Sequence, residues 1–216
     1  MMKYYPLNLS LKNKKCVVLG AGQVALRKVK RLLECGAHVS VIGKEILPEL
    51  KNLLKKKKII FKNRKANLKD LVGAFLVVAA TDDRKLNALI SEYCFKRDIL
   101  VNVVDSPKEC NFILPSVLRR GNLTISVATD GVSPALAKKI RQDIQRLFGF
   151  EYAKLLSLMK TLRPEVLKKI KDPQARRRFF KKIFHPQILG LLKKNSRQQA
   201  KKLIRGYLKK AQGQVY

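Results

Sequence analysis

The sequence predicts an α/β chain that starts with a Rossmann-like, doubly wound parallel sheet, followed by a small α+β segment and a C-terminal helical domain. Three observations carry this prediction. Short, almost continuously apolar runs alternate with segments of helical spacing, as in parallel strands covered on both faces. A glycine-rich turn joins the first apolar run to the first helical segment. The chain has 216 residues, 46% of them hydrophobic, which is enough for one or two domains with buried cores.

Five short aliphatic runs are predicted to be strands. They occupy residues 15–19, 38–42, 59–61, 75–80 and 99–104. Apolar residues at helical spacing predict helices over 23–35, 47–54 and 82–96. We expect Gly36 to end the first helix, and Thr81 is a candidate N-cap for the third.

Beyond residue 105 the regular alternation ends. Residues 111–114 and 122–128 are predicted to be extended, and Ser133-Pro134 begins a helix that runs to about residue 148. Residues 151–211 are predicted to be helical, with helix ends near Pro164, Pro173 and Pro186. The predicted parts are a nucleotide-binding domain at 1–113, a middle segment at 114–148 and a basic helical domain at 149–216.

Lysine and arginine outnumber aspartate and glutamate by 48 to 15, which gives a formal net charge of +33. This excess implies an anionic neighbour, which is nucleic acid, a membrane surface or a polyanionic ligand. A thermophilic bias does not explain it, because that bias enriches glutamate together with lysine. No apolar run approaches the roughly 20 residues of a membrane span, and residues 1–13 lack the apolar region of a secretory signal. We expect a cytoplasmic protein with no membrane segment.

The four cysteines lie far apart in the sequence and include no C-x-x-C pair. They are Cys16, Cys35, Cys94 and Cys110. This pattern is typical of reduced cytosolic thiols, and we predict neither a disulfide frame nor a metal site.

The glycine turn has the sequence Gly20-Ala21-Gly22-Gln23-Val24-Ala25, which fits G-x-G-x-x-A between a strand and a helix. Gly20 permits a tight turn, Gly22 lets the backbone approach a pyrophosphate, and Ala25 allows close contact between helix and sheet. The helix N-terminus offers free N–H groups to phosphates. The strand–turn–helix context predicts dinucleotide binding. The alternative is a glycine turn of an α/β fold that binds no nucleotide.

An acid commonly holds the ribose hydroxyls at the end of the second strand. Here the sequence is Gly43-Lys44-Glu45, so the usual position is not clearly acidic. If the second strand ends late, Glu45 is the acid that holds the ribose hydroxyls of NAD. Lys44 would instead meet the 2′-phosphate of NADP. The local sequence leaves NAD and NADP open and leans slightly toward tolerance of NADP.

Polar residues follow the fourth and fifth predicted strands at the same sheet edge. Thr81 either contacts the nicotinamide ribose or caps the next helix, and Asp82 and Asp83 suit the positive end of that helix. Asp105 ends the segment Asn102-Val103-Val104-Asp105, where a carboxylate can remove a proton as a hydride leaves the neighbouring carbon. The competing interpretation is an ordinary turn at Asp105-Ser106-Pro107.

Together these motifs resemble the precorrin-2 dehydrogenase family, which forms sirohydrochlorin and occurs alone or as the N-terminal part of siroheme synthase. The resemblance covers roughly residues 3–148. It rests on the glycine turn, on Leu33–Ala37, on Ala79-Ala80-Thr81-Asp82-Asp83, on Asn102-Val103-Val104-Asp105-Ser106-Pro107, on Phe112-Ile113-Leu114-Pro115-Ser116 and on residues 125–137. Where multifunctional members have a serine-glycine turn, this chain has Thr129-Asp130.

The resemblance implies NAD-dependent oxidation of precorrin-2 to sirohydrochlorin by a homodimer, with the interface in the middle segment. By position, Asp105 matches the family's essential aspartate. The cofactor-lining stretches of the family fall on Gly20, Gly22, Gln23, Val24, Gly43, Lys44, Thr81 and Val103. Some members also insert a metal ion into the product. The substrate is a polycarboxylate, which suits a basic protein; candidate contacts are Arg119, Arg120, Lys138, Lys139 and Arg141.

Other classes of function stay open at this point. A regulatory nucleotide-sensing module of the kind attached to potassium channels shares the glycine turn, and a basic scaffold would recruit an acidic partner enzyme. Arg176-Arg177-Arg178 and Lys181-Lys182 lie among phenylalanines and would bind phosphate without specificity. The sequence contains no recognised nucleic-acid-binding module, so nucleic acid is not the predicted partner.

Overall fold

The computed structural model describes residues 4–212. The chain divides into two compact units, Met1–Leu114 and Pro115–Tyr216, which we call the N-terminal unit and the C-terminal unit. Within residues 4–212, no helix is long and apolar enough to cross a membrane.

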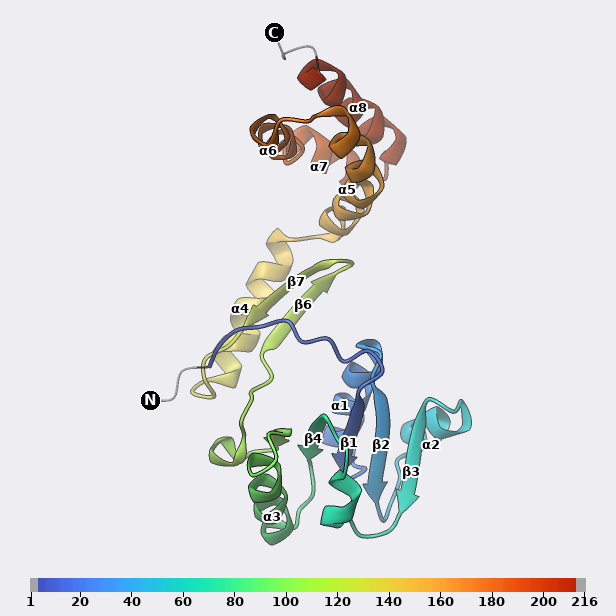
Figure 1. The fold of residues 1–216 in the computed structure, drawn as a ribbon, viewed down its shortest axis with the longest axis vertical. Helices are drawn as coiled ribbons and strands as arrows, with labels where there is room; N and C mark the ends of the chain where they lie inside the picture. The colour runs from blue at the N-terminus through green and yellow to red at the C-terminus, as the bar shows by residue number, and fades with distance from the viewer. Residues whose placement is uncertain (1–3, 213–216) are drawn as a thin grey trace. The chain divides into compact units, whose positions relative to one another are not determined.

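The N-terminal unit contains a five-stranded, wholly parallel sheet with strand order β3-β2-β1-β4-β5 (Figure 1). Its strands are β1 (Lys15–Leu19), β2 (His38–Gly43), β3 (Ile59–Asn63), β4 (Leu76–Ala79) and β5 (Leu100–Val103). The three α-helices between them are α1 (Gln23–Glu34), α2 (Pro48–Lys55) and α3 (Arg84–Phe95). Two short 3₁₀ turns follow β3 and β5, namely η1 (Leu68–Leu71) and η2 (Pro107–Glu109). The predicted doubly wound architecture is therefore confirmed.

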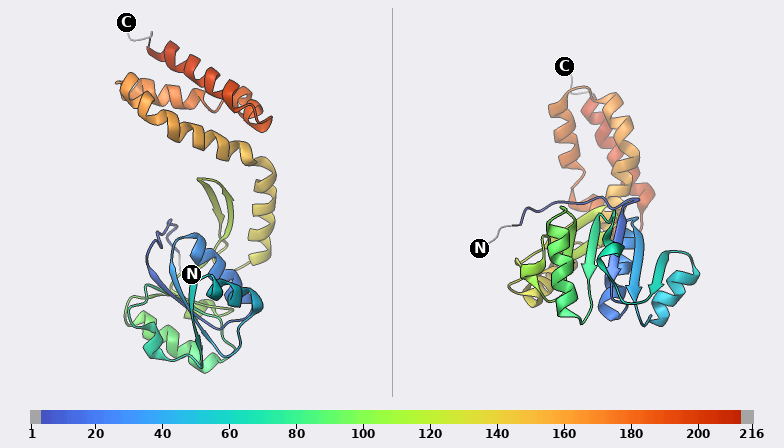
Figure 2. Two further views of the ribbon diagram at one scale, coloured as in Figure 1. Left: turned by 90° about the vertical axis from the view of Figure 1, so that its right-hand side faces the viewer. Right: turned by 60° about the horizontal axis from the view of Figure 1, so that its bottom comes forward.

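Adjacent residues of each buried strand point to opposite faces of the sheet and enter different cores. On one face, Val18 of β1 packs in a cluster with Val29 of α1 and Leu50 of α2. On the other face, Val17 packs in a cluster with Ile90 of α3. Because both faces of the sheet are covered, successive residues of a strand are all buried, and the strands are almost continuously hydrophobic in sequence. Figure 2 shows the helices on both sides of this sheet.

The end of α1 follows the prediction, whereas the start of α3 does not. Gly36 follows α1 with φ of +77°, and the N–H of Ala37 donates to the Leu32 carbonyl at 3.1 Å. The cap of α3 is Asp83, whose carboxylate accepts from the Leu86 N–H at 3.0 Å, so the prediction of Thr81 as cap is wrong. The helix begins two residues later than predicted.

In the C-terminal unit, β6 (Ser116–Arg120) and β7 (Leu123–Val127) form an antiparallel hairpin that packs with α4 (Pro134–Leu147). The prediction missed β6 and made residues 111–114 extended, where the structure has no strand. Asn111 explains the difference. Its side chain accepts from the Val101 N–H at 2.7 Å and donates to the Ile99 carbonyl at 2.8 Å, so local side-chain bonds hold this segment beside β5.

Four further helices close a separate core in the C-terminal unit (Figure 2). They are α5 (Phe150–Lys169), α6 (Pro173–Lys182), α7 (Pro186–Lys193) and α8 (Arg197–Gln212). Breaks before Pro173 and Pro186 are as predicted, but Pro164 lies inside α5. Both Pro164 and Lys160, whose carbonyl loses its bond, face solvent, while Leu162 and Val166 on the other face are buried. Burial of that apolar stripe holds the helix together through the proline.

Candidate dinucleotide site and the carboxylate after β5

A cavity of about 460 Å³ lies at the carboxyl edge of the sheet, where β1, β2, β3 and β4 end. This is the edge at which open α/β sheets bind ligands. Its walls are Gly20–Ala25, Ile42–Glu45, Arg64–Ala66, Ala80–Asp83 and Leu86. The sequence-predicted residues on these walls are Gly20, Gly22, Gln23, Val24, Gly43, Lys44 and Thr81.

The glycine turn is shaped by close backbone contacts. Gly20 has φ of +98°, and a Cβ there would lie 2.1 Å from the Ala80 carbonyl oxygen. A side chain is thus excluded both by backbone conformation and by space. Its N–H donates to the Ile42 carbonyl at 2.8 Å, which ties the turn to β2.

Gly22 is the N-cap of α1, and a Cβ at this position would meet no atom within 4 Å. The open space lies where a phosphate would approach the first N–H groups of the helix. The first turn of α1 carries no acidic residue that would repel an anion. The backbone here fits the pyrophosphate of a dinucleotide.

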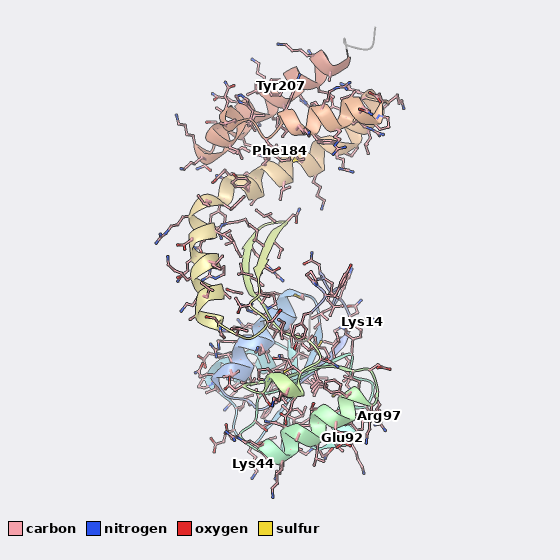
Figure 3. The ribbon with its side chains drawn as sticks, turned by 90° about the vertical axis from the view of Figure 1, so that its left-hand side faces the viewer. Lys14, Lys44, Glu92, Arg97, Phe184 and Tyr207 are labelled. Carbon is pink, nitrogen blue, oxygen red and sulfur yellow. The ribbon has the colours of Figure 1, made fainter. Side chains whose placement is uncertain are left out.

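The end of β2 packs directly against the glycine turn. A Cβ on Gly43 would lie 3.0 Å from the Ala21 Cβ, so only a glycine leaves this contact undisturbed. The next two residues, Lys44 and Glu45, are exposed on the cavity wall. Figure 3 shows Lys44 near the first turn of α3, with Glu92 and Arg97 towards the other end of that helix.

The segment after β3 supplies a wall that the sequence reasoning missed. Arg64 donates from Nη1 to Oδ2 of Asp70 at 2.9 Å and from Nη2 to Oδ1. Lys62 donates to the same carboxylate at 3.1 Å, and the Asn67 N–H donates to it at 3.1 Å. The Asp70 side chain is only 1% exposed. Burial would raise the pKa of Asp70, but these hydrogen bonds and the Arg64 charge outweigh it and lower the pKa to about 2.

The segment after β4 closes the cavity opposite β2. The Thr81 hydroxyl donates to Oδ1 of Asn87 at 2.7 Å, and the Asn87 amide donates back to the Thr81 carbonyl at 2.9 Å. Asp83 pairs with Lys65 at 3.1 Å across the opening. The hydrogen bond from the Leu86 N–H and the bond from Lys65 lower the pKa of Asp83. The opening is therefore bordered by paired charges.

Two predicted residues lie outside the cavity walls. Val103 is 3% exposed and packs in the core beneath α3. Asp105 is exposed, follows β5 and has φ of +58°, a left-handed conformation that aspartate tolerates better than most residues. The turn leaves its carboxylate open to a ligand from solvent.

A polar cluster that the sequence reasoning also missed lies beside Asp105. Lys28 of α1 is half-buried and donates to Oδ1 of Asn102 at 3.5 Å. The Asn102 amide donates to the Phe112 carbonyl at 3.3 Å and to the Cys110 thiol at 3.5 Å. Burial, followed by the charges of Arg31 and Arg27, lowers the pKa of Lys28, whereas Asp105 acts in the opposite direction. The ammonium of Lys28 is thus within electrostatic reach of the Asp105 carboxylate.

Three family models match the chain in succession. An NAD(P)-binding model matches residues 7–116. The sirohaem biosynthesis protein central model matches 120–147, and the sirohaem synthase dimerisation region model matches 151–208. The similarity therefore extends beyond residue 148, where the sequence motifs had ended.

Curated relatives are similar over most of this chain. The siroheme synthase of Thioalkalivibrio sulfidiphilus is 36% identical over 203 residues, which are 94% of this chain and 42% of that protein. The siroheme synthase of Buchnera aphidicola subsp. Acyrthosiphon pisum is 35% identical over 209 residues, which are 91% of this chain and 44% of that protein. The chain spans less than half the length of these relatives.

One solved structure is similar over nearly the whole chain. It is described as SirC, precorrin-2 dehydrogenase, and shares 26% sequence identity with a TM-score of 0.78. The match covers 94% of this chain and 100% of that one.

Proposed function

The chain belongs to the NAD(P)-binding family whose model covers residues 7–116, and from this premise we propose that it oxidises precorrin-2 to sirohydrochlorin with NAD as hydride acceptor. The solved structure with similarity over 94% of the chain is a precorrin-2 dehydrogenase. The curated relatives are siroheme synthases. The observation that carries the proposal is an open glycine cradle at the same sheet edge as an exposed carboxylate.

The cavity residues hold the dinucleotide in this proposal. Gly22 and the first N–H groups of α1 bind the pyrophosphate, and Gly20 keeps the turn tight enough for that approach. Gly43 and Lys44 line the adenosine ribose, while Gln23, Val24 and Thr81 lie along the rest of the cofactor. Val103 is buried beneath α3 and does not line the cavity, so its place along the cofactor stays a prediction. The bound NAD supplies one function, which is to accept a hydride.

Asp105 acts as the base. Oxidation removes a hydride and a proton from precorrin-2, so the hydride passes to NAD and the proton passes to the Asp105 carboxylate before it reaches water. The exposed position of Asp105 after β5 supports this role. The ammonium of the neighbouring Lys28 lies within electrostatic reach of this carboxylate.

The active species in this proposal is a homodimer. The C-terminal unit exposes large apolar side chains on and beside α4 that a second copy would cover. They are Val132 (71% exposed), Leu136 (51%), Ile140 (36%), Leu147 (71%) and Phe150 (67%). The dimerisation-region model at 151–208 adds support for an interface in this unit. The boundary at residue 148, between the predicted middle segment (114–148) and the predicted basic helical domain (149–216), stays a prediction.

The test is anaerobic incubation of the protein with precorrin-2 and NAD, with absorbance followed for sirohydrochlorin and NADH. We expect turnover by the wild type and a loss of about 100-fold or more in Asp105→Asn, because general bases contribute rates of that order. Asp98→Asn is the matched control, since Asp98 is also exposed with a positive φ of 54°. It should keep wild-type turnover.

Two results would overturn the proposal. Turnover of Asp105→Asn within tenfold of the wild type would remove Asp105 as the base. A wild type that binds nucleotide but oxidises precorrin-2 with neither NAD nor NADP would favour the nucleotide-sensing module. Ferrous ion added after the oxidation, compared with the uncatalysed rate, tests whether the protein also inserts metal.

A further inference from the structure

The outer edge of β5 is bonded by side chains. β5 is the last strand in the order of the five-stranded sheet, and the Val104 N–H donates to the Ala79 carbonyl of β4 at 2.9 Å. Alternate residues of a strand direct their backbone groups to opposite edges, so Val101 and Val103 direct theirs outward. Asn111 takes the place of a further strand at Val101, where its N–H donates to the carbonyl at 3.1 Å and its Oδ1 accepts from the N–H at 2.7 Å.

Cys110 makes the equivalent exchange with Val103 through its thiol alone. The Val103 N–H donates to Sγ at 3.2 Å, and Sγ donates to the Val103 carbonyl at 3.3 Å. The Ser106 carbonyl, also at 3.3 Å, is a second acceptor for the same thiol. Cys110 is 4% exposed, and burial raises the pKa of its thiol, so the sulfur keeps the proton that it donates. One protonated sulfur therefore joins Val103 to Ser106.

The two carbonyls flank Asp105, whose backbone lies in the left-handed region with φ of +58°. A residue other than glycine stays in this region only where its surroundings determine the conformation. The backbone bond of this turn, from the Ser106 N–H to the Val103 carbonyl, is 3.4 Å long, beyond the usual range of about 2.7–3.2 Å. Because the backbone closes the turn weakly, the thiol supplies the contacts that fix the residues on both sides of Asp105.

Cys110 is itself anchored in the N-terminal unit. Its N–H donates to the Pro107 carbonyl at 3.2 Å, and the Ser91 hydroxyl of α3 donates to the Glu109 carbonyl at 2.9 Å. Cys110 also packs in the core cluster beneath α3. The thiol is thus fixed by buried parts of the fold, whereas the Asp105 side chain faces solvent.

We propose that Cys110 is a positioning residue for Asp105, and that its thiol holds residues 103–106 in the conformation that presents the Asp105 carboxylate to the substrate. The inference rests on the proposed function, in which Asp105 is the base, and deepens it by naming what fixes the base. Proton transfer needs the base within hydrogen-bond reach of the proton. A displacement of about 1 Å can lower a rate by about 100-fold, so a loosened turn lowers kcat without weakening nucleotide binding.

The test compares two buried cysteines of the same core cluster. Cys94 is 0% exposed, and within residues 4–212 its thiol makes no hydrogen bond. Cys110→Ala and Cys94→Ala therefore remove the same atom, but only the first removes hydrogen bonds. We expect Cys110→Ala to lower kcat for precorrin-2 oxidation by about tenfold or more per folded enzyme, with KM for NAD unchanged. Cys94→Ala should keep the wild-type kcat.

Two further measurements separate positioning from a general loss of structure. Cys110→Ser should recover part of the lost kcat, because a hydroxyl also donates and accepts but lies on a shorter bond than the thiol. Amide hydrogen exchange needs no tetrapyrrole. In Cys110→Ala the Val103 N–H should exchange about tenfold faster or more, whereas the Val101 N–H, which is bonded to Asn111, should keep its wild-type rate.

The outcomes separate this inference from the proposed function. Unchanged exchange of the Val103 N–H in Cys110→Ala would show that the thiol does not hold the turn. A kcat that falls no further in Cys110→Ala than in Cys94→Ala, or that Cys110→Ser does not recover, would leave the thiol a structural role only. Both results overturn the inference while wild-type turnover stands. A wild type without turnover would remove the proposed function, and the inference with it.

Discussion

At the glycine turn, backbone geometry forms the site, whereas at the end of β5 side-chain charges form it. Gly20 and Gly43 leave room that no other residue would leave, and both line the cavity. Beside Asp105, the arrangement depends on Lys28 and Asn102, which join α1 to β5 through one hydrogen bond. The first region should therefore fail sterically when it is mutated, and the second should fail electrostatically.

Gly20→Ala is expected to have the largest effect on the glycine turn. A Cβ at 2.1 Å from the Ala80 carbonyl cannot be accommodated without separating the ends of β1 and β4. We expect unfolding to become easier by about 3 kcal/mol or more, with loss of nucleotide binding. Urea unfolding and calorimetric titration with 5′-AMP measure the two effects.

Gly73→Ala is the control that separates the cost of a positive φ from the cost of a steric clash. Gly73 has φ of +70°, but a Cβ there would meet no atom within 4 Å. This control should cost only about 1–2 kcal/mol, the price of the left-handed conformation for an ordinary residue. An equal loss of stability in both variants would show that the turn at Gly20 yields to a side chain.

The second prediction concerns the anchor of the cavity wall at Asp70. Its pKa lies at about 2 in the folded chain against an ordinary value of 3.8. A lowered pKa means that the ionised carboxylate stabilises the fold above about pH 4, and that this contribution disappears as pH falls towards 2. Asp70→Asn should therefore lower the free energy of unfolding at pH 7 by about 2 kcal/mol, as measured by urea unfolding.

The difference between wild type and Asp70→Asn should shrink as the pH is lowered from 4 to 2. Asp143→Asn is the control, because Asp143 is an exposed partner of Lys139 and its loss should change stability much less. A difference that stays constant from pH 7 to pH 2 would contradict the role of the ionised Asp70.

The sequence was sufficient for the parts of the molecule that local pattern determines. The strands follow from aliphatic runs, and the cavity residues of the glycine turn follow from a short motif in its strand–turn–helix context. The structure differs from the prediction where a residue elsewhere in the sequence determines the local conformation. Pro164 stays helical because buried leucine and valine side chains hold α5, and Thr81 fails as a cap because its hydroxyl binds Asn87.

The missed parts of the site have the same cause. Arg64 enters the cavity because of the register of β3 with β2, which no local motif specifies. Lys28 and Asn102 are 74 positions apart in the sequence and meet only in the folded sheet. The shared carboxyl edge of a parallel sheet would have suggested the segment after β3, but not which side chain enters the cavity.

The smallest predicted effect concerns the charge of Lys28 beside Asp105. Lys28→Met removes the ammonium near Asp105 and should lower turnover of precorrin-2 about tenfold, with the affinity for 5′-AMP unchanged. Stability should not fall, because burial already disfavours the charged form of Lys28 and lowers its pKa. Lys28→Arg should restore turnover in part, whereas Lys30→Met, an exposed position of the same helix, should leave turnover unchanged. A loss of stability and turnover in equal measure would instead make Lys28 a structural residue, and the charge beside Asp105 would then have no part in the reaction.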